Sequence, residues 1–291
     1  MKVSVIGLGS MGMGAALNLA QAGHDVFGVE PRQAAWAELT GAGGTALPDA
    51  ASLPPGIECA IILVVNAAQA GQVLDACLDQ LAPDAVVVCS TTLSPADALR
   101  FGERVAATGR LYLDAPVSGG ATGSRAGSMT VMASGSEAAF ARAQPALDAI
   151  AGKVWHLGEA PGVGSTVKMV NQLLAGVHIA TAAEAMALGI RAGADPRTLF
   201  EVISGSAGSS WMWQNRIPHV LEGDDTPHSA VDIFVKDLGI VLDQARALTF
   251  PLPMASAAHQ LFLAASAAGH GRRDDAFVIR VWEALAGIKL P

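Results

Sequence analysis

The stretch Gly7–Leu19 reads GLGSMGMGAALNL and directly follows the short apolar run Val3–Ile6. It places the pattern G-x-G-x-x-G between a run with strand character and a run with helical character. In such a turn the first glycine allows a tight bend, the second lets a pyrophosphate approach the backbone, and the third lets helix and strand pack closely. The first N–H groups of the helix then face the phosphates. We therefore expect a dinucleotide at six residues: Gly7, Leu8, Gly9, Ser10, Met11 and Gly12.

The residues that follow support this interpretation and distinguish the two nicotinamide cofactors. Gly23 stands where a helix cap belongs, and Asp25–Val29 resumes as a second strand that leads to Glu30. An acid at that place accepts hydrogen bonds from the ribose hydroxyls of NAD and repels the 2′-phosphate of NADP. Arg32 could instead pair with that phosphate. We predict NAD, with NADP less favoured. A glycine-rich turn without a ligand is the alternative, because a chain with 32 glycines meets the pattern by chance.

Composition and charge exclude several classes of protein. The 291 residues are 51% hydrophobic and 15% charged, which suits a large core and two domains. The net charge is −8 and no basic stretch occurs, which argues against nucleic acid or an anionic membrane as partner. We find no signal peptide or membrane-spanning run and expect a cytoplasmic protein. The cysteines and histidines lack metal-ligand spacing, so we expect no metal and three reduced thiols.

The order of the apolar runs predicts the fold. Strand-like runs alternate with helical stretches in the first half, which is typical of a parallel, doubly wound α/β sheet of the Rossmann type. The expected strands are Val3–Ile6, Asp25–Val29, Cys59–Val65, Ala85–Cys89 and Leu111–Ala115, and Ser128–Ala133 with Lys153–Leu157 could finish the sheet in a different orientation. The expected helices are Thr166–Gly193, Pro196–Ser204, Asp232–Leu248 and Pro253–Ala268. We expect a Rossmann NAD-binding domain over residues 1–161 and an all-helical substrate and oligomerisation domain over residues 162–291.

Two strand ends are expected to face the same cofactor, because ligands of such sheets bind beyond the carboxyl ends of the strands. They are Val64-Val65-Asn66 and Ser90-Thr91-Thr92. For the three hydroxyl residues, capping of a helix that starts near Pro95 is an equal alternative to ligand binding.

A small-residue segment is the candidate site for a substrate anion. Asp114–Gly127 reads DAPVSGGATGSRAG, in which the backbone N–H groups of Ser118, Gly119 and Gly120 would suit a carboxylate. A flexible glycine and serine turn is the alternative for this segment considered alone.

The candidate proton-transfer residue is Lys168, in the segment GVGSTVKMVNQ. Asn171 and Gln172 follow it by three and four residues and share its helix face. Burial of a lysine cation is costly, which lowers the pKa and allows proton exchange with an alcohol near neutral pH. Residues 160–183 contain no acid, which argues against a surface ion pair along this helix. For a second lysine, Lys236, an ordinary surface pair with the adjacent Asp237 is a serious alternative.

The segments GLGSMGMGAALNL, DAPVSGGATGSRAG, GVGSTVKMVNQ and FVKDL, in this order, resemble the β-hydroxyacid dehydrogenases. That family includes 3-hydroxyisobutyrate dehydrogenase and tartronate semialdehyde reductase, and the resemblance spans nearly the whole chain. Three further stretches, Ser209–Arg216, His219–Gly239 and Phe250–Ala255, are most similar to the family members that oxidise L-threonate.

The resemblance implies roles around the substrate. Lys168 matches the family's catalytic lysine, a general base during oxidation and a general acid in reverse. Ser118, Gly119 and Gly120 match the loop that holds the substrate carboxylate. Asn171 matches the asparagine that orients the substrate beside the lysine.

The resemblance also implies cofactor contacts and shows two departures. Lys236 matches the lysine that closes over the cofactor, and Val64, Val65 and Thr92 match positions that line the nicotinamide half of the site. The usual Leu-Pro is replaced by Val64-Val65, which removes a rigid proline but keeps the backbone contacts possible. Gln172 stands where many members carry a second asparagine, which weakens its assignment as a substrate contact.

The implied reaction is NAD-dependent oxidation of a small hydroxy acid, L-threonate to 2-oxo-tetronate, with Lys168 as the base. Alternatives within the same class are a 3-hydroxyisobutyrate dehydrogenase and a reductase of tartronate or succinate semialdehyde. A non-catalytic dinucleotide-sensing protein is the alternative from another class. The resemblance further implies a homodimer or homotetramer.

Overall fold

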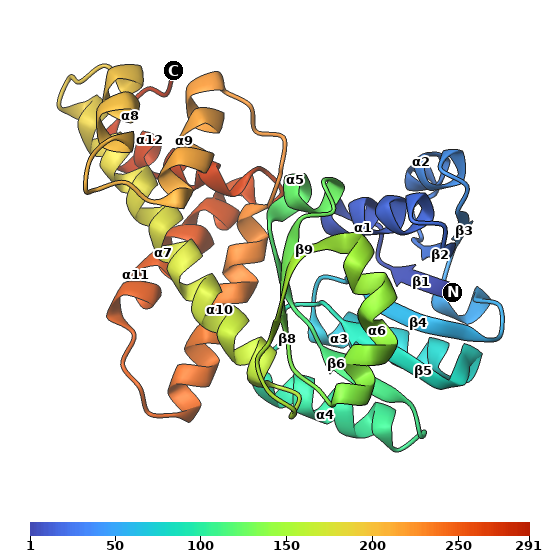
Figure 1. Ribbon diagram of the computed structural model, residues 1–291. Coiled ribbons are helices and arrows are strands. Elements are labelled where there is room, and N and C mark those ends of the chain that lie inside the picture. Colours follow the sequence, from blue (N-terminus) through green and yellow to red (C-terminus); the bar gives the residue numbers. More distant parts are fainter. The chain divides into compact units, whose positions relative to one another are not determined.

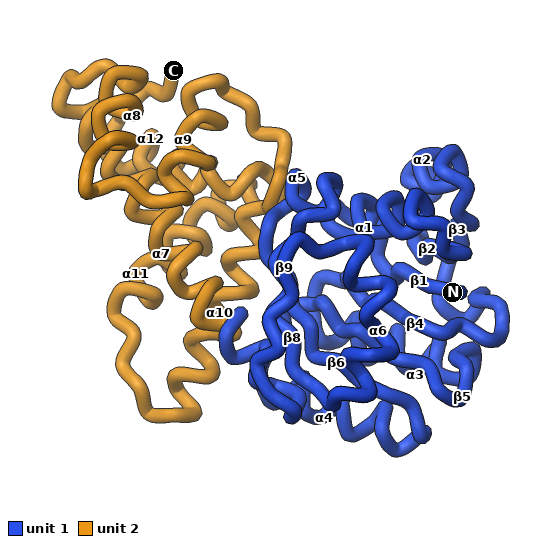
Figure 2. Tube along the Cα trace, viewed as in Figure 1, with its two compact units in different colours: residues 1–168 blue, residues 169–291 orange.

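The computed structural model describes residues 1–291, which divide into two compact units, residues 1–168 and residues 169–291 (Figure 2). Helix α7 (Val163–Arg191) contains the point of division. The functional domain limits expected at residues 161 and 162 stay a prediction.

Unit 1 is built on a six-stranded parallel sheet in the order β3-β2-β1-β4-β5-β6 (Figure 1). The strands are β1 (Lys2–Ile6), β2 (Asp25–Val29), β3 (Thr45–Leu47), β4 (Ile57–Ile62), β5 (Leu81–Cys89) and β6 (Leu111–Asp114). In β1, Ile6 lies opposite Val29 on one side and Ile62 on the other. The carboxyl ends of β1, β2 and β4 are therefore neighbours, as the Rossmann prediction requires.

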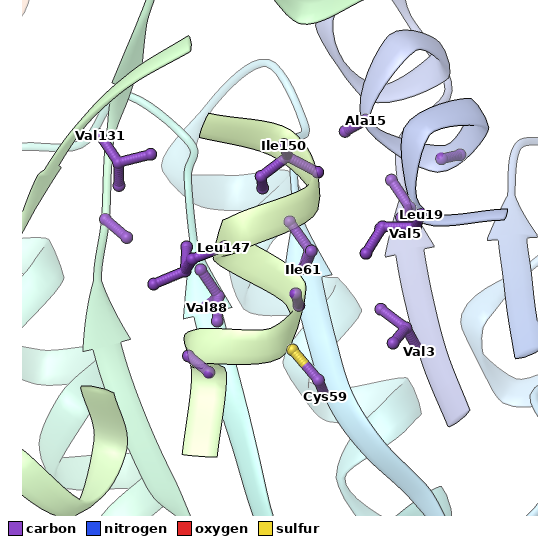
Figure 3. Packing of buried hydrophobic residues seen from close by; sticks show 14 of the residues in the cluster. Val3, Val5, Ala15, Leu19, Cys59, Ile61, Val88, Val131, Leu147 and Ile150 are labelled. Carbon is purple, nitrogen blue, oxygen red and sulfur yellow. The ribbon is translucent and has the colours of Figure 1, made fainter. Parts of the chain in front are cut away.

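Helices cover both faces of this sheet because its strands are apolar on both faces. The helices of unit 1 that pack on it are α1 (Ser10–Gln21), α2 (Trp36–Gly41), α3 (Ala67–Cys77), α4 (Pro95–Ala106) and α6 (Glu137–Ile150), whereas the short α5 (Gly120–Arg125) packs on α1 and on the second sheet. Figure 3 shows one face, where Val5, Ile61 and Val88 pack against Leu19 of α1 and Leu147 of α6. A second buried cluster joins the other face to α3 and α4. The doubly wound fold is thereby confirmed.

Two expected strands do not finish the large sheet. They are β8 (Met129–Ala133) and β9 (Ala151–His156), which form a separate three-stranded sheet with β7 (Val117–Ser118). β8 is antiparallel to β7 and parallel to β9. One isolated bridge, Asp114 with Ser134, connects β6 to this sheet. Pro116 comes next; its carbonyl oxygen accepts from the N–H of Met132 over 2.9 Å, but it has no N–H to donate in return, which separates this bridge from the pairing of β7 with β8 that begins at Val117.

Unit 2 is helical, as the sequence predicts. After α7 come α8 (Pro196–Ser204), α9 (Trp211–Glu222), α10 (Val231–Ala247), α11 (Pro253–Ala265) and α12 (Val281–Ala286). Its core is one buried cluster with Met186, Phe234, Phe262 and Phe277 among its members.

Helix α9 was not expected from the sequence. It starts after the capping side chain of Ser210 and contains Pro218 in its interior. Its buried Arg216 donates from Nε to Asp275 Oδ1 over 2.5 Å, across 59 residues of chain. Burial raises the pKa of Asp275 to about 6, with the arginine opposing that shift. Because Asp275 is so distant from α9 in the sequence, the contact leaves no local pattern that would have indicated this helix.

Helix α7 is also long and apolar enough, by length and composition alone, to cross a membrane. In its apolar window 44% of the residues are buried inside the protein. Ile179 and Met186 of this helix belong to the core of unit 2. A core helix of a soluble protein meets the same criteria, so the helix is weak support for a membrane span.

Candidate active site

Three glycines shape the turn between β1 and α1. Gly7 has a φ of 97°, and a Cβ there would lie 2.6 Å from the carbonyl oxygen of Leu63. A Cβ on Gly12 would overlap the carbonyl oxygen of Gly7. Gly9 caps α1, and the space where its Cβ would project is open. The first N–H groups of α1 therefore have room for a pyrophosphate, so the residues present fit a dinucleotide.

Glu30 lies just beyond β2 with a side chain that is 6% exposed. Arg32 donates to it twice, from Nε to Oε1 over 2.8 Å and from Nη2 to Oε2 over 3.1 Å. These hydrogen bonds hold the pKa of Glu30 below its ordinary value, although burial opposes them. The carboxylate is therefore ionised at neutral pH. Arg32 is paired with this acid and is not presented alone to a phosphate. The pairing therefore favours NAD over NADP.

The ends of β4 and β5 are joined by a hydroxyl. The N–H of Val64 donates to Thr91 Oγ1 over 3.2 Å. Val65 lies beyond the strand with an exposed side chain. Helix α4 is capped by Ser94, so capping is wrong as the role of Ser90-Thr91-Thr92. The roles of Val64, Val65 and Thr92 toward a nicotinamide stay predictions.

The expected substrate loop connects β7 to α5. Ser118 ends β7, and Gly119 and Gly120 follow with φ values of 134° and 62°. Both glycines are exposed. The short helix α5 packs against α1, the helix of the glycine turn. The structure thus places the expected carboxylate loop and the expected pyrophosphate turn on two helices that touch.

The start of α7 is held by a buried acid that the sequence did not identify as functional. Asp114 Oδ2 accepts from the N–H groups of Gly162 and Ser165, each over 2.9 Å. Its Oδ1 accepts from Ser165 Oγ over 2.7 Å. Burial raises the pKa of Asp114, and these hydrogen bonds oppose the shift. Asp114 therefore holds the first turn of α7 in place. Lys168 lies three residues beyond Ser165 on the same helix and is itself buried.

The other expected polar residues form a network in unit 2. Asn171 Nδ2 donates to Gln172 Oε1 over 3.0 Å, and Gln172 Nε2 donates to Asp237 Oδ2 over 2.5 Å. Lys236 Nζ lies 2.6 Å from Asp237 Oδ1. Asp237 is buried, so its pair with Lys236 is not the ordinary surface pair considered from the sequence. The longer side chain of Gln172 reaches that acid, a link that only the tertiary structure reveals.

Neither the cysteines nor the residue types that commonly bind metals form a further site. Cys59, Cys77 and Cys89 are buried and unbridged. Burial raises the pKa of Cys59 to about 12 and that of Cys77 to about 11, which makes the thiols poor nucleophiles. No group of three or more His, Cys, Asp or Glu residues is arranged to hold a metal ion.

The strand order, the open glycine turn and the ionised acid beyond β2 define a nicotinamide dinucleotide-binding protein of the Rossmann type, with a second, helical unit. Residues 2–158 match the family described as the NAD binding domain of 6-phosphogluconate dehydrogenase. Residues 162–282 match the family described as NAD-binding of NADP-dependent 3-hydroxyisobutyrate dehydrogenase. The chain belongs to the 3-hydroxyisobutyrate dehydrogenase-like family of hydroxyacid dehydrogenases.

Full-length relatives support this membership. L-threonate dehydrogenase of Cupriavidus necator is 51% identical over 99% of this chain and 97% of its own. L-threonate dehydrogenase of Escherichia coli strain K12 is 50% identical over 99% and 96%. The crystal structure of 3-hydroxyisobutyrate dehydrogenase from Salmonella typhimurium is 50% identical, with a TM-score of 0.93 over 97% of this chain and 99% of that one. Family membership indicates an enzyme and not the non-catalytic sensor left open by the sequence.

Replacing Asp114 should destabilise the first turn of α7. In Asp114→Ala the donors of Gly162 and Ser165 lose their buried acceptor, so we expect the free energy of unfolding to fall by about 3 kcal/mol. Urea denaturation at 25 °C measures this change. The control, Asp97→Ala, removes a partly exposed acid that pairs with Arg100 and should cost under about 1 kcal/mol. Equal stability of both variants would refute the role of Asp114.

Proposed function

We propose that this protein oxidises L-threonate to 2-oxo-tetronate with NAD. The observation that carries the proposal is the identity of 51%, over nearly the full length of both chains, to an enzyme named L-threonate dehydrogenase. The Salmonella protein of similar identity carries the name 3-hydroxyisobutyrate dehydrogenase, which makes 3-hydroxyisobutyrate the second candidate substrate. Both acids offer a carboxylate and a nearby secondary or primary alcohol, so the same groups of the protein could serve either.

In the proposed reaction the backbone N–H groups at Ser118, Gly119 and Gly120 hold the carboxylate, and Asn171 orients the alcohol. The neutral amine of Lys168 accepts the hydroxyl proton as the C2–H bond breaks and the carbonyl forms. Bound NAD supplies the acceptor for the hydride. One hydroxy acid and one NAD therefore give one 2-oxo acid, one NADH and one proton.

Turnover of candidate acids tests this function. Purified protein is given L-threonate, D-threonate, 3-hydroxyisobutyrate and glycerate, each with NAD and with NADP, and formation of reduced cofactor is followed by absorbance. L-threonate with NAD should give the highest kcat/KM. In Lys168→Ala, kcat should fall by about 10³-fold because the base is lost, with the dissociation constant of NAD nearly unchanged.

The control for this variant is Lys153→Ala, which removes an exposed lysine of the same unit that lies over Trp155. It should keep wild-type kinetics. Most of the activity remaining in Lys168→Ala would contradict the assignment of the base, whereas preference for another acid would overturn only the substrate.

We further propose that Glu30 selects NAD over NADP. Glu30→Ala removes the carboxylate and releases Arg32, so the ratio of kcat/KM values should move toward NADP by about tenfold or more. The control Arg32→Ala keeps the acid and should keep the preference for NAD. Because the pKa of Glu30 is lowered, the acid stays charged, and the wild-type preference should not change between pH 7 and pH 9, a range in which the 2′-phosphate of NADP also keeps its charge. An unchanged ratio in Glu30→Ala would refute this role.

A homo-oligomeric, cytoplasmic protein without nucleic acid or membrane partners is part of the same proposal. The net charge of −8 supports the absence of anionic partners. Helix α7 exposes apolar residues at spacings of three and four, the pattern of a helix that packs on another: Val163, Val167, Val170 and Leu174. These residues are the proposed contact with a second copy.

Sedimentation velocity tests this contact. The wild-type protein should sediment as a dimer or tetramer, and Leu174→Glu should shift it toward the monomer because a charge would replace an apolar contact. Leu99→Glu, at an exposed leucine of unit 1, is the matched control and should leave the oligomer intact. A monomeric wild-type protein would overturn the proposal.

A further inference from the structure

Helices α1 and α5 approach each other more closely than side chains normally allow. Gly14 of α1 faces Ser124 of α5, and a Cβ on Gly14 would lie 2.5 Å from Ser124 Oγ and 2.6 Å from the N–H nitrogen of Arg125. Ser124 is fully buried at this contact. Glycine at position 14 is therefore required for the two helices to touch at backbone distance.

Polar bonds fix this close contact at both ends. The hydroxyl of Ser124 donates to the carbonyl oxygen of Met11, in the first turn of α1. Asn18, one turn beyond Gly14, donates from Nδ2 to the carbonyl oxygen of Ser124 over 2.7 Å and to that of Gly14 over 2.8 Å. The amide group thus ties the last turn of α5 to α1.

The three residues of α1 that face α5 lie on one side of that helix. Met11, Gly14 and Asn18 are spaced by three and four residues, so they form a single stripe. The first of them belongs to the glycine turn that fits a pyrophosphate. On the other side of the contact, the N–H of Gly123 donates to the carbonyl oxygen of Gly119 over 2.9 Å, which connects Ser124 rigidly to the exposed loop.

We propose that Asn18 and Ser124 are positioning residues that hold the loop Ser118–Gly120 at a fixed place beside the pyrophosphate turn. Two consecutive glycines with positive φ would otherwise leave that loop wide conformational freedom. We call the hydrogen bonds of Asn18 and Ser124 the clamp. The clamp removes this freedom, so the backbone N–H groups of the loop meet the substrate carboxylate in one arrangement relative to the cofactor turn. The inference rests on the proposed function, which assigns the substrate carboxylate to this loop.

The decisive variants are Asn18→Asp and Ser124→Ala. Asn18→Asp keeps the size of the side chain but replaces its donor with an acceptor that faces two carbonyl oxygens. We expect KM for L-threonate to rise about tenfold or more in both variants, with the dissociation constant of NAD within about threefold of wild type. A role in packing alone would leave the isosteric Asn18→Asp close to wild type.

The matched control is Ser136→Ala, which removes the capping bond of α6 in the same unit and lowers stability without touching the contact of α1 with α5. It should lower the thermal midpoint without changing KM. Unchanged KM in both clamp variants, or equal rises in KM and in the dissociation constant of NAD, would overturn the proposal.

Hydrogen exchange separates this inference from the proposed function. Without substrate, backbone amides of residues 118–125 should exchange faster in Asn18→Asp than in wild type, and Ser136→Ala should not change them. Unchanged exchange in Asn18→Asp would refute the clamp whatever the substrate is. If the wild-type protein oxidises another acid instead, the proposed substrate fails, and the KM comparison is made with that acid.

Discussion

The buried carboxylate of Asp114 fixes the helix that carries Lys168 to the end of β6. It accepts from the N–H groups of Gly162 and Ser165, which lie at the start of α7 where no intrahelical carbonyl is available to them. The positive end of the helix dipole faces the same carboxylate, which favours its charge despite burial. Lys168 follows one turn later. The proposed base is therefore positioned by a strand end, which is more rigid than a loop.

Close backbone contacts have the same effect elsewhere in unit 1. Gly12 brings the start of α1 against Gly7, and Gly14 brings α5 against the next turn of α1. In each case a missing side chain, and not an added one, sets the position of a binding segment. The sheet order places the ends of β1, β2 and β4 side by side, and the contact of Gly12 with Gly7 lies just beyond the first of these ends. Close backbone contacts of this kind leave little conformational freedom to the N–H groups that would bind a cofactor.

The charged residues expected to contact the cofactor occur in pairs within each unit. Arg32 forms an ion pair with the ionised Glu30 beyond β2, and Lys236 forms one with the buried Asp237. Neither cation is therefore presented alone to an anion, in keeping with the net charge of −8. Gln172 completes one of these pairs by donating to Asp237, which gives the departure from the family's usual asparagine a structural role.

The sequence by itself determined the glycine turn, the five long strands of the large sheet, most helices of unit 2 and the place of Lys168 on a helix. These features follow from local spacing, because the period of apolar residues and the steric freedom of glycine act over a few residues. Only the tertiary structure decided the separate sheet of β7, β8 and β9, helix α9, the seat that Asp114 provides and the contact of Asn18 with Ser124. The contacts of Asp114 and Asn18 join residues 48 to 106 positions apart, and which distant polar groups meet depends on how the whole core packs.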